Sequence, residues 1–391
     1  MGLGAIENVV LFVGDAVRFD KSVNQLSKLG PTCRTISASL HTPASFGSLL
    51  TGLNVPAHGI TGFQNVLPKE IPSLLELNGI NTAFSDKTGT MHEDMHRIFR
   101  TDARASLDEI QSPFIWIARD PGGHAPYDGY DGETYDQMDE NASEYFSRVA
   151  GDIELIERDY QRGVRDSVSR FKQCVETIRK RGLADETLLI YTSDHGELLG
   201  EYGLLGHNHV ACPELVYVPT TFVHPKLEPG QVNQLFRNID IVPTVLDLIE
   251  RKSELPLDGV SYFEEGSRIG YNHFEMTFYN NGLLSDFSNK VRSCWDEGGG
   301  HVFVESGHRD SIAIYLGLLA NGHKGKHILK TKNILSSGRK FLPGYEVYGS
   351  PNISKHMAKS YIEDTVDRTI NPTVSNLNED TQDRLEDLGY L

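Results

Sequence analysis

The sequence predicts an α/β protein with a central, mostly parallel sheet between layers of helices, followed by a smaller C-terminal α+β subdomain. Apolar runs typical of buried strands alternate with helical patterns over about the first 250 residues, as in parallel sheets. The chain has 391 residues, more than one core usually needs. After Leu257, Gly, Asn and Ser become more frequent and helical periodicity fades. We therefore expect an α/β core over residues 1–255 and a subdomain over residues 256–391.

The expected strands of the core are short apolar runs. Residues 8–20, NVVLFVGDAVRFD, contain a buried-strand pattern followed by polar residues. Residues 82–86 and 113–120 are two more runs of this kind, and residues 215–223, LVYVPTTFV, are a further one. Residues 182–197 predict a helix end, a turn, a strand and a polar loop.

The expected helices of the core lie over residues 141–181 and 238–250. The first carries apolar residues at helical spacing, which predicts a stripe facing the core: Tyr160, Val164, Val168, Phe171 and Val175. The second has Pro243 near its start, where the missing N–H costs little. In the subdomain, residues 297–305, EGGGHVFVE, and 312–319, IAIYLGLL, are expected to form short strands.

Composition and charge narrow the class of function. Apolar residues make up 39% of the chain and charged residues 23%, which is typical of a soluble globular protein. The formal net charge is −17, and no basic stripe is present, so we expect no binding of nucleic acid. An anionic substrate would need a locally positive site, such as a metal ion.

The four cysteines, Cys33, Cys174, Cys212 and Cys294, are scattered without a CxxC pair, so we expect reduced thiols. The first apolar run, residues 9–13, is too short for a membrane span and lacks a signal-peptide cleavage site. These features predict a cytoplasmic protein without a transmembrane segment. The sequence carries no indication of the oligomeric state.

Polar side chains follow two of the expected strands directly. Asp15 follows the first, and Asp194 and His195 follow the strand of residues 182–197. Ligands bind beyond the carboxyl ends of strands in open α/β sheets. Two carboxylates and one imidazole suit a divalent cation. Taken alone, an aspartate after a strand is more often a turn or cap residue than a ligand.

The stretch SLHTPASFGSLLTG, residues 39–52, places a threonine at an expected helix start. Thr42 fits the N-cap and Pro43 the first helical position. A hydroxyl at this place also faces the positive end of the helix dipole, where an anion is stabilised. Contact with a dication would make its proton easier to lose. Cap and nucleophile are therefore compatible roles for Thr42.

Seven short motifs, in this order along the chain, resemble the sulfatase branch of the alkaline phosphatase superfamily: TPASFGSLLTG (42–52) with PAHGI (56–60), DPGGHAPYD (120–128), SDHGE (193–197), GEYGLLGHNH (200–209), IDIVPTVLDLI (239–249), LDGVSYF (257–263) and RLEDLGYL (384–391). The resemblance covers nearly the whole chain and is thin between residues 264 and 380. It implies a metallohydrolase that cleaves sulfate or phosphate esters through a covalent intermediate.

Site residues are implied by position in these motifs. Asp15, Asp194 and His195 match metal ligands, and Thr42 occupies the nucleophile position, where it also contacts the metal. One divalent ion is implied: Ca, Mg, Mn and Zn all remain open. The second metal site of the phosphatases has no clear ligand set here.

Three histidines and one arginine are further candidates. His124 lies in a segment similar to the family's DPHAPY and is expected to contact the substrate. His207 and His209 fall where relatives place a lysine or histidine against the anion or the leaving group. Each histidine has a structural alternative. Arg18 is a candidate for binding the anion, with packing or a surface position as the alternative.

The main departure from the family lies at the nucleophile. Sulfatases carry CxPxR, whose cysteine becomes formylglycine, whereas residues 42–46 here are TPASF, so no formylglycine is expected. A formylglycine hydrate releases sulfate by re-forming its aldehyde, but a threonine sulfate must wait for attack by water. The chemistry therefore favours phosphomonoesters or phosphodiesters, and phosphodiesterase-like and phosphoglycerol- or phosphoethanolamine-transferase-like relatives do use threonine.

The expected substrate is a small anionic ester: a sulfated or phosphorylated glycan, lipid head group or metabolite. Three alternatives stay open beside phosphoester hydrolysis. They are a sulfuric ester hydrolase that works without formylglycine, a transferase of the phosphoglycerol or phosphoethanolamine type, and a non-catalytic homologue that binds an anion. Loops around residues 64–80, 120–150 and 264–310 are expected to set the specificity.

Overall fold

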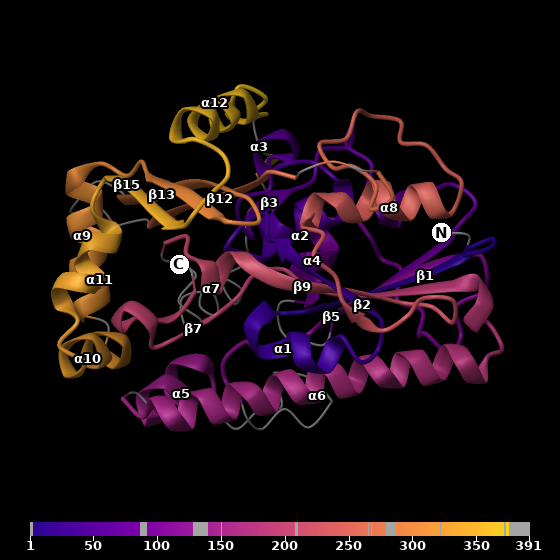
Figure 1. The fold of residues 1–391 in the computed structure, drawn as a ribbon, viewed down its shortest axis with the longest axis horizontal. Helices are drawn as coiled ribbons and strands as arrows, with labels where there is room; N and C mark the ends of the chain where they lie inside the picture. The colour runs from indigo at the N-terminus through magenta and orange to yellow at the C-terminus, as the bar shows by residue number, and fades with distance from the viewer. Residues whose placement is uncertain are drawn as a thin grey trace.

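The computed structural model describes residues 3–86, 92–127, 140–149, 151–207, 210–264, 266, 268–278, 287–320, 322–370 and 373–374. Its main body is an eight-stranded sheet in the order β10-β2-β9-β6-β1-β5-β4, with β11 beside β2 (Figure 1). Strands β1 (Asn8–Gly14), β4 (Asn81–Asp86), β5 (Phe114–Asp120) and β6 (Thr187–Ser193) run parallel. The predicted α/β class and the predicted strands of the core are confirmed.

The centre of the sheet is buried on both faces. Every residue of β1, β5 and β6 is buried, which explains why these strands are continuous apolar runs instead of alternating ones. Val9 and Leu11 of β1 face one layer of helices, while Val10 and Phe12 face the other. The site described below lies at the carboxyl ends of these central strands.

One strand of the main body runs against the others. β9 (Tyr217–Val223) is antiparallel to both β6 and β2 (Pro31–Ile36), so the sheet is mixed. Threonine side chains join these strands: the hydroxyls of Thr35 and Thr220 are 2.7 Å apart, and those of Thr192 and Thr220 are 2.9 Å apart. β2 was not among the expected strands, because its buried positions include threonines and no apolar run.

Helices cover both faces of the sheet. Figure 1 shows α1 (Phe19–Leu26), α5 (Ala142–Val149) and α6 (Ile153–Lys180) on one side, and α2 (Thr42–Thr51) and α8 (Ile241–Leu248) on the other. The predicted stripe of α6 is buried. The further elements of the main body are α3 (Val55–His58), α4 (His92–Ile98), α7 (Pro213–Val216), β3 (Asn65–Val66), β7 (Leu198–Leu199), β8 (Leu205–Gly206), β10 (Gly230–Gln231) and β11 (Phe236–Arg237).

The single helix expected over residues 141–181 is in fact two helices. α5 ends at Val149, and Gly151 adopts a φ of 94°, in the left-handed region that favours glycine. Asp152 then starts α6, because its side chain accepts a hydrogen bond from the Leu155 N–H.

The C-terminal part is built on a second, antiparallel sheet. Its strands are β12 (Gly270–Phe278), β13 (Phe287–Trp295), β14 (Gly299–Val304) and β15 (Gly344–Gly349). Helices α9 (His308–Ala320), α10 (Gly322–Lys330) and α11 (Ile334–Phe341) lie between β14 and β15 in the chain. α12 (Lys355–Val366) packs on β13, and β16 (Thr373–Val374) pairs with β3.

The predicted strand over residues 297–305 is present as β14, but the one over residues 312–319 is wrong, because those residues belong to α9. Periodicity does not separate a helix from a strand in so short an apolar run. The apolar core is continuous through both parts, with Val9 and Trp295 in one cluster, so the boundary at residues 255 and 256 stays a prediction.

Two other expectations concern the whole chain. None of the four cysteines forms a disulfide, as predicted. No helix in the described part of the chain is both long enough and apolar enough to cross a membrane.

Candidate active site

Two neighbouring strands bring the predicted metal ligands together. Gly14 of β1 lies opposite Ser193 of β6, so the next residues, Asp15 and Asp194, emerge side by side. His195 Nε2 lies 3.6 Å from Asp194 Oδ2 and 3.9 Å from Asp15 Oδ1. All three side chains are buried, and their ligand atoms lie within 4.8 Å of one another.

Thr42 reaches the same group from the start of α2. Its Oγ1 lies 3.3 Å from His195 Nε2. The predicted N-cap role is wrong: the cap position belongs to His41, and Thr42 is the first helical residue. The Thr42 hydroxyl is therefore directed to the histidine instead of to the backbone of its own helix.

The backbone fixes the orientation of the His195 ring. His195 Nδ1 lies 3.0 Å from the Gly196 carbonyl oxygen, which only accepts, so Nδ1 donates its proton there. Nε2 then faces Thr42 and the two carboxylates, and a neutral ring would offer this nitrogen to a metal ion.

The residues present fit a divalent cation. Asp15 Oδ1 and Asp194 Oδ2 are buried and have no hydrogen-bond partner among the described residues. Buried carboxylate oxygens without a partner are costly, and a cation would compensate both. Burial and the charge of Asp15 also raise the pKa of Asp194. The donors, two carboxylates and one imidazole, do not select among Ca, Mg, Mn and Zn.

A buried arginine supports the first ligand. Arg119 on β5 donates to Asp15 Oδ2 at 2.6 Å and lies 3.6 Å from Asp86 Oδ2. Burial alone would raise the pKa of the Asp15 carboxyl, but the charges of Arg119, His124 and His195 and the Arg119 hydrogen bond together outweigh burial, so the pKa is lowered. Sequence reasoning missed Arg119, although an arginine inside the apolar run FIWIARD was the available signal.

His207 is held by a carboxylate that sequence reasoning also missed. Glu197 Oε2 lies 2.6 Å from His207 Nδ1, and Glu197 Oε1 accepts a hydrogen bond from Tyr127 at 2.6 Å. Burial raises the pKa of Glu197 to about 8. The His207 ring lies 4.4 Å from the His195 ring and 5.2 Å from the His124 ring, centre to centre. The signal for Glu197 was its place in the SDHGE motif.

The remaining candidates differ in their placement. His124 belongs to the same group of rings, and burial lowers its pKa. Arg18 lies 2.9 Å from Asp20 and 2.6 Å from Glu201, so two carboxylates already compensate its charge. His209 lies outside the described residues.

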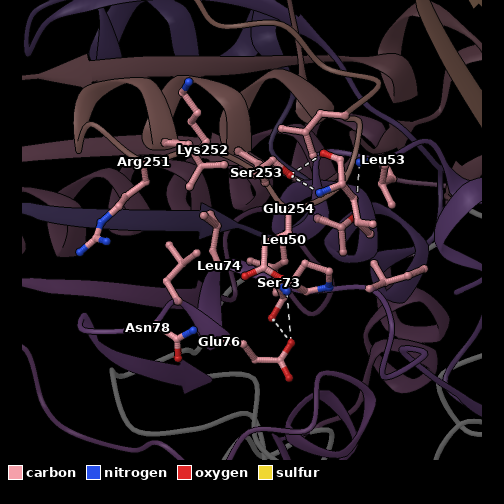
Figure 2. A pocket seen from close by; sticks show the side chains of 18 residues that line it. Leu50, Leu53, Ser73, Leu74, Glu76, Asn78, Arg251, Lys252, Ser253 and Glu254 are labelled. Carbon is pink, nitrogen blue, oxygen red and sulfur yellow. Dashed lines mark hydrogen bonds between the residues drawn. The ribbon is translucent and has the colours of Figure 1, made fainter.

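A cavity of about 320 Å³ lies elsewhere in the molecule (Figure 2). Leu50 and Leu74 contribute to its apolar lining, and Glu76, Arg251 and Lys252 are among its charged lining residues. It touches the C-terminal end of α2, while Thr42 stands at the other end of this helix. None of the site residues above lines it.

Comparison with known proteins identifies the family. The sulfatase family model matches residues 97–250. The low-salt glycan biosynthesis sulfotransferase Agl7 of Haloferax volcanii is 30% identical over 415 aligned residues, which cover 100% of this chain and 98% of that relative. The chain belongs to the sulfatase family.

Solved structures of sulfatase-like proteins share the fold. A phosphonate monoester hydrolase of Agrobacterium radiobacter aligns with a TM-score of 0.58 at 15% identity, over 86% of this chain and 96% of that one. A 2-O GAG sulfatase aligns with a TM-score of 0.56 at 13% identity, over 88% and 95% of the two chains. The sulfatase resemblance read from the motifs is thus confirmed.

Proposed function

We propose that this sulfatase family member is a metal-dependent enzyme that cleaves sulfate or phosphate esters through a covalent intermediate on Thr42. The observation that carries the proposal is the position of Thr42 Oγ1, 3.3 Å from His195 Nε2, in the group where one oxygen each of Asp15 and Asp194 has no hydrogen-bond partner among the described residues. Thr42, Asp15 and the Asp194–His195 pair come from three distant stretches of the chain. A threonine with only a structural role would not need to lie beside these potential metal ligands.

Asp15, Asp194 and His195 would hold the cation, with Thr42 in contact. Such a cation offsets the charge of the carboxylates and of the substrate and makes a neighbouring hydroxyl more acidic. The start of α2 adds the positive end of a helix dipole at Thr42, where negative charge develops during attack. Arg119 keeps Asp15 oriented through its bond to Oδ2.

In the first step Thr42 Oγ1 gives up its proton to solvent, forms a bond to phosphorus or sulfur, and the bond to the leaving alcohol breaks. We assign His207 as the group that protonates the leaving oxygen. Its Nδ1 shares a proton with Glu197 Oε2, so a proton given up at Nε2 is replaced from Glu197. His124, beside His207, would contact the substrate anion. In the second step water, or another alcohol, attacks and releases Thr42.

Phosphoester hydrolysis is the first candidate. A threonine ester of sulfate lacks the aldehyde route by which formylglycine releases sulfate, so its turnover depends on an outside nucleophile. Phosphorus is the better match for such a two-step displacement at threonine. The reduced cysteines agree with action in the cytoplasm, which we also expect.

Transfer of a sulfuryl group to a glycan hydroxyl is the second candidate. The relative that aligns with this whole chain is named a glycan biosynthesis sulfotransferase. A threonine sulfate that water attacks slowly would persist until an acceptor hydroxyl arrives, which suits transfer better than hydrolysis.

A substrate and acceptor screen tests both candidates. Purified protein would be loaded with each of the four metals and given p-nitrophenyl phosphate, bis-p-nitrophenyl phosphate or p-nitrophenyl sulfate, with and without a sugar acceptor. Phosphate release without acceptor supports the first candidate. Release of p-nitrophenol from the sulfate ester that requires the sugar, with a sulfated sugar as the second product, supports the second. Activity toward no ester, with no metal bound, would instead support an anion-binding homologue.

Variants of Thr42 test the nucleophile. Thr42→Ala should lose about 10³-fold or more in turnover, whereas Thr42→Ser keeps a hydroxyl and should retain part of it. Thr51→Ala makes the same change at the far end of α2 and serves as the control. Mass spectrometry of the quenched reaction should find the transferred group on Thr42. Wild-type rates in Thr42→Ala would exclude the mechanism.

A further inference from the structure

Helices α9, α10 and α11 form one end of the molecule (Figure 1) and carry an unusual number of exposed apolar side chains. Eleven large apolar residues of the described chain are exposed, and six of them lie between His308 and Leu342. Leu335 is 84% exposed and Leu316 58%. We name this the α9–α11 surface, with the exposed apolar residues Ile312, Leu316, Leu329, Ile334, Leu335 and Leu342.

α9 is apolar on both of its sides. Ile314, Leu318 and Leu319 pack against the core, while Ile312 and Leu316, one turn apart, point to solvent. A helix that is apolar all round is normally covered all round. The outer side of α9 is therefore a surface suited to a partner.

The same segment has a charge opposite to that of the chain. From residue 308 to residue 342 there are seven lysines and arginines and one acidic residue, Asp310, so the segment carries a net charge of +6 while the whole chain carries −17. Lys340 turns inward to Glu346, and Lys324 turns toward the main body. The other five are exposed: Arg309, Lys326, Lys330, Lys332 and Arg339.

We propose that the α9–α11 surface docks on an anionic membrane surface. Apolar side chains beside exposed lysines and arginines are the combination that binds at the interface of anionic lipids. The chain's overall negative charge opposes contact with such a membrane everywhere else, so the basic surface also orients the molecule.

Two other occupants fit less well. A second copy joined through this surface would place like charges against each other, because a two-fold interface pairs each patch with itself. A protein partner would need well-packed pockets for its anchor residues. Here the exposed apolar and basic side chains are spread over three helices, which a lipid interface accommodates without a fixed shape.

The surface adjoins the candidate active site. Lys324 Nζ lies 3.6 Å from where a side chain on Gly206 would begin, and Gly206 precedes His207. The neighbouring residue His323 stacks its ring on Phe146 of α5. Docking through α9–α11 would therefore hold the His207 segment close to the membrane.

Vesicle flotation tests the proposal with the full chain. Wild type should float with phosphatidylglycerol-containing vesicles at low salt and not with pure phosphatidylcholine vesicles. Binding should be lost in 1 M NaCl, where screening acts over about 3 Å. Failure of the wild type to bind the anionic vesicles at low salt would overturn the proposal.

Two double variants separate the contributions. Lys326→Glu with Lys330→Glu should weaken binding by more than about 25-fold, since each basic residue contributes about fivefold. Leu316→Ser with Leu335→Ser should weaken it by about 100-fold, at about tenfold for each leucine. The control places the same kinds of change on α12, Met357→Ser with Lys359→Glu, both exposed, and should bind as wild type does.

The remaining outcomes point to other occupants. Variants that bind as tightly as wild type would refute the assignment. A Tm of the leucine variant well below that of the α12 control would show that the chain itself covers these leucines. A wild-type dimer that the leucine variant turns into monomer, without any vesicle binding, would show a contact between copies. Each of these results overturns the proposal.

Discussion

Replacing Arg119 with methionine tests how the site is held together. The Arg119 guanidinium is buried between Asp15, at 2.6 Å, and Asp86, at 3.6 Å, and both carboxylates are buried as well. Removing one partner of a buried ion pair leaves an uncompensated charge and typically costs about 3–5 kcal/mol. We expect Arg119→Met to lose this amount of unfolding free energy in guanidinium chloride with EDTA present.

The control and a metal-dependent arm make this measurement specific. Arg179→Met breaks an exposed pair with Glu176 and should cost less than about 1 kcal/mol. A divalent cation at Asp15 would compensate part of the charge that Arg119 leaves, so the loss should be smaller with metal than with EDTA. The reasoning is refuted if Arg119→Met loses no more stability than Arg179→Met, or if metal leaves its loss unchanged.

Three further predictions concern metal, proton transfer and pH. Chelation should lower the Tm and metal return should restore it, because metal at 100 times its Kd adds about 2.7 kcal/mol to the unfolding free energy; calorimetry should show no such shift for Asp194→Ala. Glu197→Gln should slow alkyl esters by about 10²-fold but aryl esters far less, because only poor leaving groups need a proton from His207; equal losses in steady-state assays would argue against this role. Burial alone would raise the pKa of Glu275, but His273 and Lys290 outweigh it and lower the pKa from 4.5 to about 2. Glu275→Gln should therefore destabilise most near neutral pH, and chemical denaturation should show the difference shrinking as pH falls from 4.5 toward 2; a constant difference would exclude the ion pairs.

The meeting of Asp15, Asp194 and His195 at one edge of the sheet was predictable from the sequence. Each follows an apolar run, and the carboxyl ends of parallel strands share one edge of a sheet. Thr42 was predictable only through the family motif, since nothing in its own helix indicates where the hydroxyl points. Its distance of 3.3 Å to His195 depends on contacts between segments more than 150 residues apart.

The supporting residues could not be found in the same way. Arg119 and Glu197 act through partners far away in the chain: Asp15 for the arginine, and Tyr127 for the glutamate. A charged residue that the fold buries needs a partner, but the sequence does not indicate which residue that partner is. The error at α9 has another cause, because so short a run of mostly apolar residues fits a strand and a buried helix equally well.

Helix α2 connects two very different environments. Its first residue, Thr42, stands among the carboxylates, and its last turn borders the cavity of Figure 2, about 15 Å away by the rise of a ten-residue helix. An inhibitor that imitates the substrate would have to carry the charge of an anionic ester into the group around Thr42. A neutral compound bound beside Leu50 would act on the proposed nucleophile from the far end of α2, by displacing the helix that carries it.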